Sequence, residues 1–73
     1  MIIPLKNLSV RLTPREVEVI NLMAEGFTSK EIALELGLSI RTVEAHRYSL
    51  MKKTGVSNSI MLVKLYLEVK KSA

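Results

Sequence analysis

The residues with the most distinctive chemistry lie between positions 39 and 53, in the stretch SIRTVEAHRYSLMKK. At the 3.6-residue spacing of a helix, one side collects mostly apolar residues, namely Val43, His46, Leu50 and Met51. The other positions carry guanidinium, carboxylate, hydroxyl and ammonium groups, with which proteins contact the phosphates and base edges of a duplex. The pattern indicates the recognition helix of a helix-turn-helix.

Basic charge is concentrated on this stretch. Residues 39–55 carry four cationic side chains against one acidic side chain, for a net charge of +3, whereas residues 14–25 carry one against three, for a net of −2. The whole chain has a net charge of +4. Such an excess is also typical of an ordinary solvated helix face, so the interpretation depends on the motif more than on the charge.

Phosphate contacts are expected at the ends of the proposed helices. Lys30, Arg41 and Thr42 lie in predicted first turns, where free backbone N–H groups favour an anion. Lys52 and Lys53 close the other end of the central helix and complete a clamp on a DNA strand. Loss of one such contact should weaken binding to every DNA sequence.

Base contacts are expected from the middle of the same helix. The Glu44 carboxylate either accepts a hydrogen bond from cytosine N4 or pairs with Arg41 or Arg47 and orients it. Ala45 is small enough to meet a thymine methyl group, and the Tyr48 hydroxyl suits a base or a phosphate. Arg47 has the chemistry for guanine, although we predict it as a DNA contact before a base contact.

Local signals predict the elements that position these residues. Thr13 with Glu16, and Thr28 with Glu31, form capping boxes at two helix starts, and Gly37 suits the sharp turn before the central helix. The sequence therefore predicts an all-α domain at residues 12–73, preceded by an N-terminal arm at residues 1–11. The four predicted helices lie near residues 14–25, 29–36, 40–54 and 58–70.

The last helix and the arm are less constrained. Residues 58–70 hold too many apolar groups for one stripe, so we expect a second buried side: a homodimer interface through Met61, Leu65 and Val69, or a contact with another domain. The arm has no clean period. It is either flexible or partly packed through Leu5, Leu8 and Val10, with Lys6 and Arg11 available for phosphates.

Several landmarks at fixed spacing support a more specific interpretation. They are Leu12-Thr13-Pro14-Arg15-Glu16, Gly26, Ser29-Lys30-Glu31-Ile32-Ala33, Leu38-Ser39, Arg41-Thr42-Val43-Glu44, His46, and Lys53 before Gly55-Val56. In this order they resemble the LuxR/GerE-type helix-turn-helix domain, the output module of many bacterial response regulators and quorum-sensing regulators. The resemblance runs from Leu12 to about Val63. Thr54 departs from it, because the family usually has an apolar residue there.

The resemblance implies four helices and a homodimer on DNA whose contacts run through the fourth helix. It also implies that Glu44, Ala45 and Tyr48 face base edges. The residues that it implies hold phosphates or the orientation of the domain are Lys30, Arg41, Thr42 and Lys53.

Other classes of function find little support. The chain has no cysteine and a single histidine, His46, which we expect to be a packed structural residue, and no spacing suggests a catalytic triad. We therefore expect no enzyme activity, no cofactor and no metal. No apolar run is long enough for a membrane span, and we expect a cytoplasmic protein without a membrane partner.

The preferred hypothesis is a bacterial transcriptional regulator that binds double-stranded DNA as a homodimer. The alternative is a protein-interaction module that inhibits another regulator through its fourth helix. A promoter-recognition domain of a sigma factor fits less well, because of the long central helix and the apolar fourth helix. A sensor domain upstream and RNA polymerase are further candidate partners.

Overall fold

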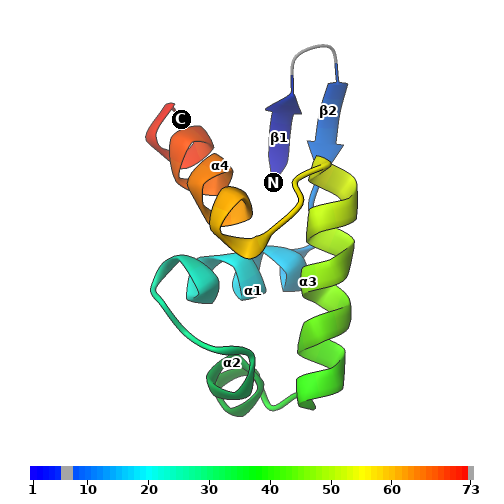
Figure 1. Ribbon diagram of the computed structural model, residues 1–73, viewed down its shortest axis with the longest axis vertical. Coiled ribbons are helices and arrows are strands. Elements are labelled where there is room, and N and C mark those ends of the chain that lie inside the picture. The colour runs from blue at the N-terminus through cyan, green and yellow to red at the C-terminus, as the bar shows by residue number, and fades with distance from the viewer. Residues whose placement is uncertain (6–7, 73) are drawn as a thin grey trace.

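The computed structural model describes residues 1–5 and 8–72, apart from the side chains of Leu5, Leu8 and Ser72. A β-hairpin precedes four helices (Figure 1). The elements are β1 (Ile2–Leu5), β2 (Leu8–Arg11), α1 (Pro14–Ala24), α2 (Ser29–Leu36), α3 (Ile40–Thr54) and α4 (Ser59–Ser72). The prediction of a four-helix, all-α helix-turn-helix domain is confirmed, and every predicted helix bound lies within two residues of the observed one.

Local caps account for this agreement. The Thr13 hydroxyl accepts a hydrogen bond from the Glu16 N–H at 3.1 Å, and the Glu16 carboxylate accepts one from the Thr13 N–H at 2.8 Å. Thr28 and Glu31 repeat this reciprocal arrangement at the start of α2. α2 then ends at Gly37 with φ of 67°, a left-handed conformation that costs glycine little.

α4 begins at Ser59, one residue after the predicted bound at residue 58. The Asn58 side-chain oxygen accepts a hydrogen bond from the Met61 N–H at 2.9 Å. Asn58 is therefore the capping residue, as the strong preference of asparagine for this position explains. Ser59 is the first residue of α4, and its hydroxyl is left to bind elsewhere.

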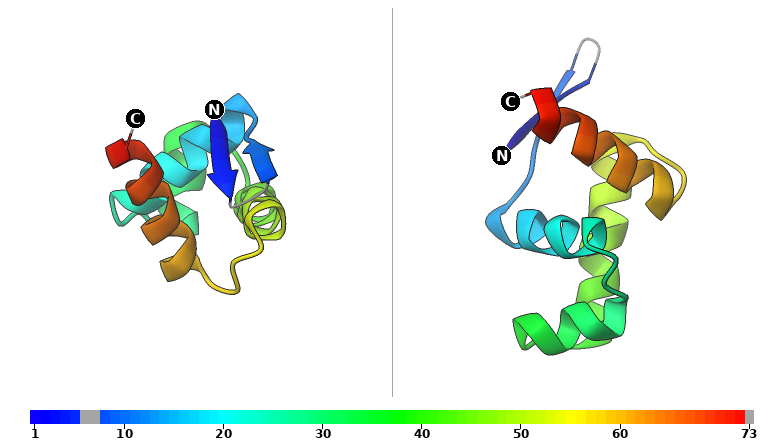
Figure 2. Two further views of the ribbon diagram at one scale, coloured as in Figure 1. Left: turned by 90° about the horizontal axis from the view of Figure 1, so that it is seen from above. Right: turned by 90° about the vertical axis from the view of Figure 1, so that its left-hand side faces the viewer.

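The helices pack around α3, which runs along the longest axis of the molecule (Figure 1). α2 lies across the N-terminal half of α3, α1 crosses nearer its middle, and α4 and the hairpin lie toward its C-terminal end (Figures 1 and 2). Each element contributes apolar side chains to one shared core. The residues of that core are Ile3, Leu12, Val19, Ile20, Met23, Ile32, Ala33, Val43, Leu50, Leu62 and Tyr66.

The N-terminal segment is paired and packed rather than a free arm. β1 and β2 are antiparallel, with Ile3 opposite Val10, and the Leu12 N–H donates to the Met1 carbonyl at 2.8 Å. Ile3 is fully buried, which anchors the hairpin to the core. Strands of four residues are too short to show a period in the sequence. The predictions for Lys6 and for the side chains of Leu5 and Leu8 lie outside the described residues.

Candidate nucleic-acid interface

One face of α3 is open to solvent along the whole length of the helix. Arg41, Ala45, Tyr48 and Lys52 are exposed and follow one another at helical spacings of four, three and four residues, which places them on one side. We call these four residues the outward stripe. The opposite side of α3 is held in the core by Val43 and Leu50, both fully buried.

Within the outward stripe, Tyr48 and Lys52 support each other. The Lys52 ammonium nitrogen lies 5.7 Å from the centroid of the Tyr48 ring, within the range of a cation–π contact. The Tyr48 residue is 63% exposed. The aromatic ring is therefore presented to solvent in a defined place, with a positive charge beside it.

The residues predicted to hold phosphates from helix starts are all exposed. Lys30 is the second residue of α2, and Arg41 is the second residue of α3. The Ser39 hydroxyl caps α3 by accepting from the Thr42 N–H at 3.0 Å, and it donates to the Thr42 hydroxyl at 2.9 Å. The Lys30 and Arg41 side chains thus stand at the positive ends of two helix dipoles, where an anion is favoured.

Glu44 lies at the edge of the outward stripe and is held from α2. Its Oε1 atom accepts a hydrogen bond from the Ser29 hydroxyl. The same oxygen lies 3.9 Å from Nε of Arg47. The side chain is still 58% exposed. Of the two alternatives that the sequence left open, the structure contains the pairing with Arg47.

Arg47 is turned into the molecule. Its Nη1 group donates to the Ser29 hydroxyl at 3.0 Å, and its Nη2 group donates to the Ser59 hydroxyl at 2.6 Å. Only 20% of the side chain is exposed. We predicted Arg47 as a DNA contact, whereas the structure uses its guanidinium to join α2, α3 and α4. Position on the helix explains this, because Arg47 lies on the same side as the buried Val43.

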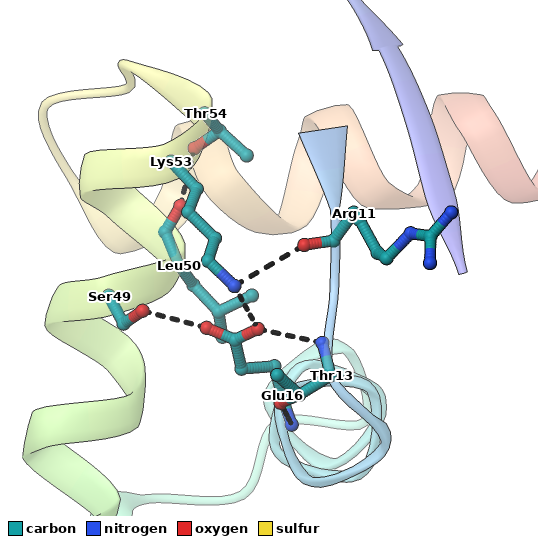
Figure 3. Close-up of polar contacts among 7 residues, drawn as sticks. All are labelled: Arg11, Thr13, Glu16, Ser49, Leu50, Lys53 and Thr54. Atoms are coloured by element: carbon teal, nitrogen blue, oxygen red, sulfur yellow. Dashed lines mark hydrogen bonds and ion pairs between the residues drawn. The ribbon is translucent and has the colours of Figure 1, made fainter. Parts of the chain in front are cut away.

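Lys52 and Lys53 also have different surroundings, although we predicted both as phosphate contacts. Lys53 reaches back to α1, where its ammonium group donates to Glu16 Oε1 at 2.6 Å (Figure 3). The ammonium group also donates to the Arg11 carbonyl at 3.3 Å. The Lys53 ammonium group is therefore bound by acceptors of its own domain, whereas Lys52 lies on the outward stripe beside Tyr48.

Glu16 is a central polar residue that we did not predict in this role. Besides the cap and Lys53, its carboxylate accepts a hydrogen bond from the Ser49 hydroxyl at 2.7 Å (Figure 3). The residue is 2% exposed. Burial by itself raises the pKa of Glu16, but hydrogen bonds from Lys53, Thr13 and Ser49, together with the Lys53 charge, lower that pKa to about 2. The carboxylate thus fixes the start of α1 against the C-terminal half of α3.

The sequence did contain a signal for the contacts of Glu16 with Ser49 and Lys53. Ser49 and Lys53 are four residues apart and share one side of α3, and Glu16 and Lys53 are both landmarks of the family resemblance. Thr54, the departure from the family pattern, is accommodated locally, because its hydroxyl donates to the Leu50 carbonyl at 2.8 Å.

The residues predicted for a dimer interface fall into two groups. Met61 is 49% exposed, but Leu65 and Val69 are half-buried against the core of their own domain. Besides Met61, the exposed large apolar residues of α4 are Ile60, at 81%, and Leu67, at 48%, which lie seven residues apart on one side. The exposed apolar surface of α4 thus shares Met61 with the predicted interface, but it includes Ile60 and Leu67 rather than Leu65 and Val69.

Within residues 1–5 and 8–72, no three metal-binding side chains from His, Cys, Asp or Glu gather in one place. Nor does any helix there combine the length and the apolar character needed to cross a membrane. His46 is half-buried on α3.

Comparison with known proteins identifies the family of this domain. A sequence model named GerE, describing bacterial regulatory proteins of the luxR family, matches residues 10–66. The chain belongs to the LuxR family. The match includes α1, α2, α3 and the outward stripe.

Relatives within the LuxR family are transcriptional regulators. The transcriptional regulatory protein UhpA of Escherichia coli K12 is 53% identical over 53 residues, which cover 73% of this chain and 27% of UhpA. A structure of an RcsB–DNA complex matches with a TM-score of 0.76 and 46% identity, over 81% of this chain and 29% of RcsB. A structure of two RcsB dimers bound to two parallel DNAs matches with a TM-score of 0.78 and 45% identity, over 82% and 30%.

The chain spans less than a third of the length of UhpA and of the RcsB chains in both structures. What the comparisons support is therefore the domain itself. It is a LuxR-family DNA-binding domain of the type found in transcriptional regulators.

Proposed function

We propose that this domain binds double-stranded DNA selectively, with α3 in the major groove, and regulates transcription in the bacterial cytoplasm as a homodimer through α4. The outward stripe carries the proposal. It is the open face of a helix of 15 residues, which at about 1.5 Å per residue is roughly 22 Å long and fits along a groove. Solved DNA complexes of the related RcsB support the same use of the fold.

Two groups of residues share the work in this proposal. Lys30, Arg41, Thr42 and Lys52 contact phosphates, because they are exposed and lie in the first or last turn of a helix. Ala45 and Tyr48 face base edges from the middle of the outward stripe, and Glu44 reaches a base from its edge. This division places affinity at the ends of α3 and selectivity in its middle.

Arg47 and Lys53 have a different proposed role from the one that their charge suggested. Both cations already bind protein acceptors, Arg47 on α2 and α4 and Lys53 on α1. We assign them to holding α3 in place. Their removal should therefore change stability or the orientation of α3, in addition to any loss of long-range attraction for DNA.

Binding to duplex at several salt concentrations tests the phosphate contacts. Lys30→Ala and Arg41→Ala should each weaken binding to all sequences and lower the slope of log K against log salt by about 0.9. Lys71→Ala is the matched control, because it removes the same charge near the C-terminus of α4, remote from α2 (Figure 1). Slopes that fall equally in all three variants would refute the assignment, since general charge would then explain binding.

The proposed dimer uses the apolar surface of Ile60 and Leu67, with Met61 beside it. Two copies of α3 would then read half-sites about 34 Å apart on one side of the duplex. Ile60→Asp should reduce the proportion of two-copy complexes in sedimentation on a two-half-site duplex. Because Ile60 is 81% exposed, the free energy of unfolding of the monomer should hardly change. Unchanged pairing on DNA would place the interface elsewhere.

A protein-interaction module remains the second candidate, because the exposed Ile60 and Leu67 would suit a partner regulator equally well. That function predicts no salt-dependent affinity for nonspecific duplex, so the same titration separates the two candidates. A sensor domain and a contact with RNA polymerase are further proposed partners of the regulator.

A further inference from the structure

The Arg47 side chain on α3 donates hydrogen bonds to both α2 and α4. Its guanidinium uses separate nitrogens for separate partners: Nη1 for Ser29, Nη2 for Ser59, and Nε toward Glu44. A planar guanidinium has donors in a fixed fork, so movement of one partner changes the direction available to the others. Arg47 therefore links the positions of three helices.

Arg47 with its partners Ser29, Glu44 and Ser59 forms a junction between three helices, and Glu44 is the partner that faces solvent. Both of its contacts fall on Oε1, through Ser29 and Arg47, which leaves Oε2 able to accept a hydrogen bond from a ligand. The nearby guanidinium also offsets the negative charge, which reduces the repulsion between Glu44 and DNA phosphates. A carboxylate held in this way suits the N4 amino group of cytosine in the major groove.

Ser59 is the partner that belongs to α4. It is the first residue of that helix, and its hydroxyl is available because Asn58 provides the cap. The Arg47–Ser59 hydrogen bond, at 2.6 Å, consequently connects α3 directly to the start of the helix that we assign to subunit pairing. Any shift of α4 on pairing acts on this bond.

We propose that Arg47 is a positioning residue that orients the Glu44 carboxylate toward a base. Because Arg47 also binds α4, the orientation of this carboxylate depends on the position of α4. Base selectivity next to Glu44 is then coupled to subunit pairing through the bond between Arg47 and Ser59. The inference rests on the proposed DNA binding through α3 and pairing through α4. It concerns selectivity, which neither proposal requires of Arg47.

Ser59→Ala tests the coupling, because it removes the acceptor on α4 and leaves the outward stripe and the Asn58 cap intact. Ser57→Ala is the matched control, an exposed serine two residues earlier. The first measurement is the NMR signal of the Arg47 Nε–H group in the free protein, which Ser59→Ala should shift and Ser57→Ala should not. The second is discrimination between base pairs, from selection out of a random duplex pool followed by affinity ratios.

In the parent, discrimination at the pair next to Glu44 should be greater on a duplex with two half-sites than on one half-site. Ser59→Ala should reduce it about fivefold on the full site, remove the difference between the two duplexes, and leave the salt slope unchanged. Arg47→Lys, which keeps the charge but not the fork, should have the same effect.

Three results would overturn the inference. The first is an Arg47 Nε–H signal that does not change in Ser59→Ala, and the second is a shifted signal with unchanged discrimination between base pairs. The third is a variant that loses the same affinity for every DNA sequence. The last would make Arg47 a phosphate contact. Failure of the underlying function is distinguishable, because the parent itself would then show no salt-dependent binding to any duplex. In that case the Nε–H measurement would still report whether the junction exists in the free protein, although its role in selectivity would fall with the function.

Discussion

Replacement of Glu16 by glutamine should destabilise the domain by an amount that depends on pH. The pKa of Glu16 is about 2 in the folded domain, against an ordinary value of 4.5. At about 1.36 kcal/mol for each pH unit, this difference corresponds to about 3 kcal/mol of stability. Because the Lys53 side chain is 35% exposed, solvent weakens the attraction, and we expect a loss of about 2–3 kcal/mol near neutral pH.

Such a loss is large for this domain. At about 0.05–0.15 kcal/mol per residue, a domain of this size has a total stability of about 4–11 kcal/mol. Glutamine keeps one carbonyl oxygen to accept from the Thr13 N–H, and its amide NH2 group can donate to the Ser49 hydroxyl in place of the bond that the hydroxyl now donates, so the change removes mainly the charge and its pairing with Lys53. Glu16→Gln should slow or abolish folding only if the Glu16–Lys53 pair contributes more to the stability of the domain than the pKa of Glu16 indicates.

Urea denaturation of parent and Glu16→Gln between pH 7 and pH 2 measures the effect. The folded-state pKa lies below the unfolded value, so the stabilisation is fully present above about pH 4.5 and is lost as pH falls toward 2. The two proteins should therefore differ near pH 7 and converge near pH 2. Glu18→Gln is the matched control, because the Glu18 pair with Arg15 is 50% and 42% exposed and should be worth less than about 1 kcal/mol.

A difference between parent and Glu16→Gln that stays constant from pH 7 to pH 2 would refute the reasoning, since it would not come from the ionised carboxylate. Equal stability of the two proteins near pH 7 would refute it as well. A double-mutant cycle with Lys53→Met adds a check, because the two substitutions should be strongly non-additive if the residues act as a pair.

Three further substitutions probe the frame around α3. Tyr66→Phe removes the hydroxyl that donates to the Asn21 side chain and should cost about 1 kcal/mol of unfolding free energy in urea, with unchanged affinity for DNA. Asn58→Ala removes the bond to the Met61 N–H and should cost about 1 kcal/mol, visible as earlier amide hydrogen exchange in the first turn of α4. Gly37→Ala meets no neighbouring atom but must adopt φ of 67°, so calorimetry should record a loss of about 1–2 kcal/mol.

Helix positions could be predicted from the sequence because their determinants are local. Thr13 and Thr28 each precede a glutamate at the third helical position, and Gly37 and Gly55 follow the last turns of α2 and α3. Each signal depends on residues within one or two turns. The stretch that binds DNA in the proposal was found for the same reason, since the period of α3 separates its buried from its open face.

The direction of individual charged side chains could not be predicted, because neighbouring helices decide it. Lys52 and Lys53 are adjacent, yet one lies on the outward stripe and the other binds Glu16. Arg47 has the chemistry of a base contact, but the serines that hold it come from α2 and α4. Such partners lie 12 to 37 residues away in the chain, and single-sequence patterns do not show them.

α4 and the hairpin illustrate the same limit for apolar residues. The composition of α4 correctly indicated more apolar surface than one core needs, but not which side faces out. α4 packs against α1, α3 and β1 of the hairpin; its Leu62 and Tyr66 are buried, whereas Ile60 and Leu67 are exposed. Because the hairpin strands have only four residues each, the sequence offered no period from which to predict that contact.

The most direct test of the account follows the amide signals of the ¹⁵N-labelled domain during titration with a duplex chosen from a random pool. The account predicts that the largest changes occur along the open face of α3 and at the start of α2. The residues concerned are Lys30, Arg41, Thr42, Ala45, Tyr48 and Lys52. Changes confined to α4 or to the hairpin, with those residues unaffected, would contradict the claim that α3 reads DNA.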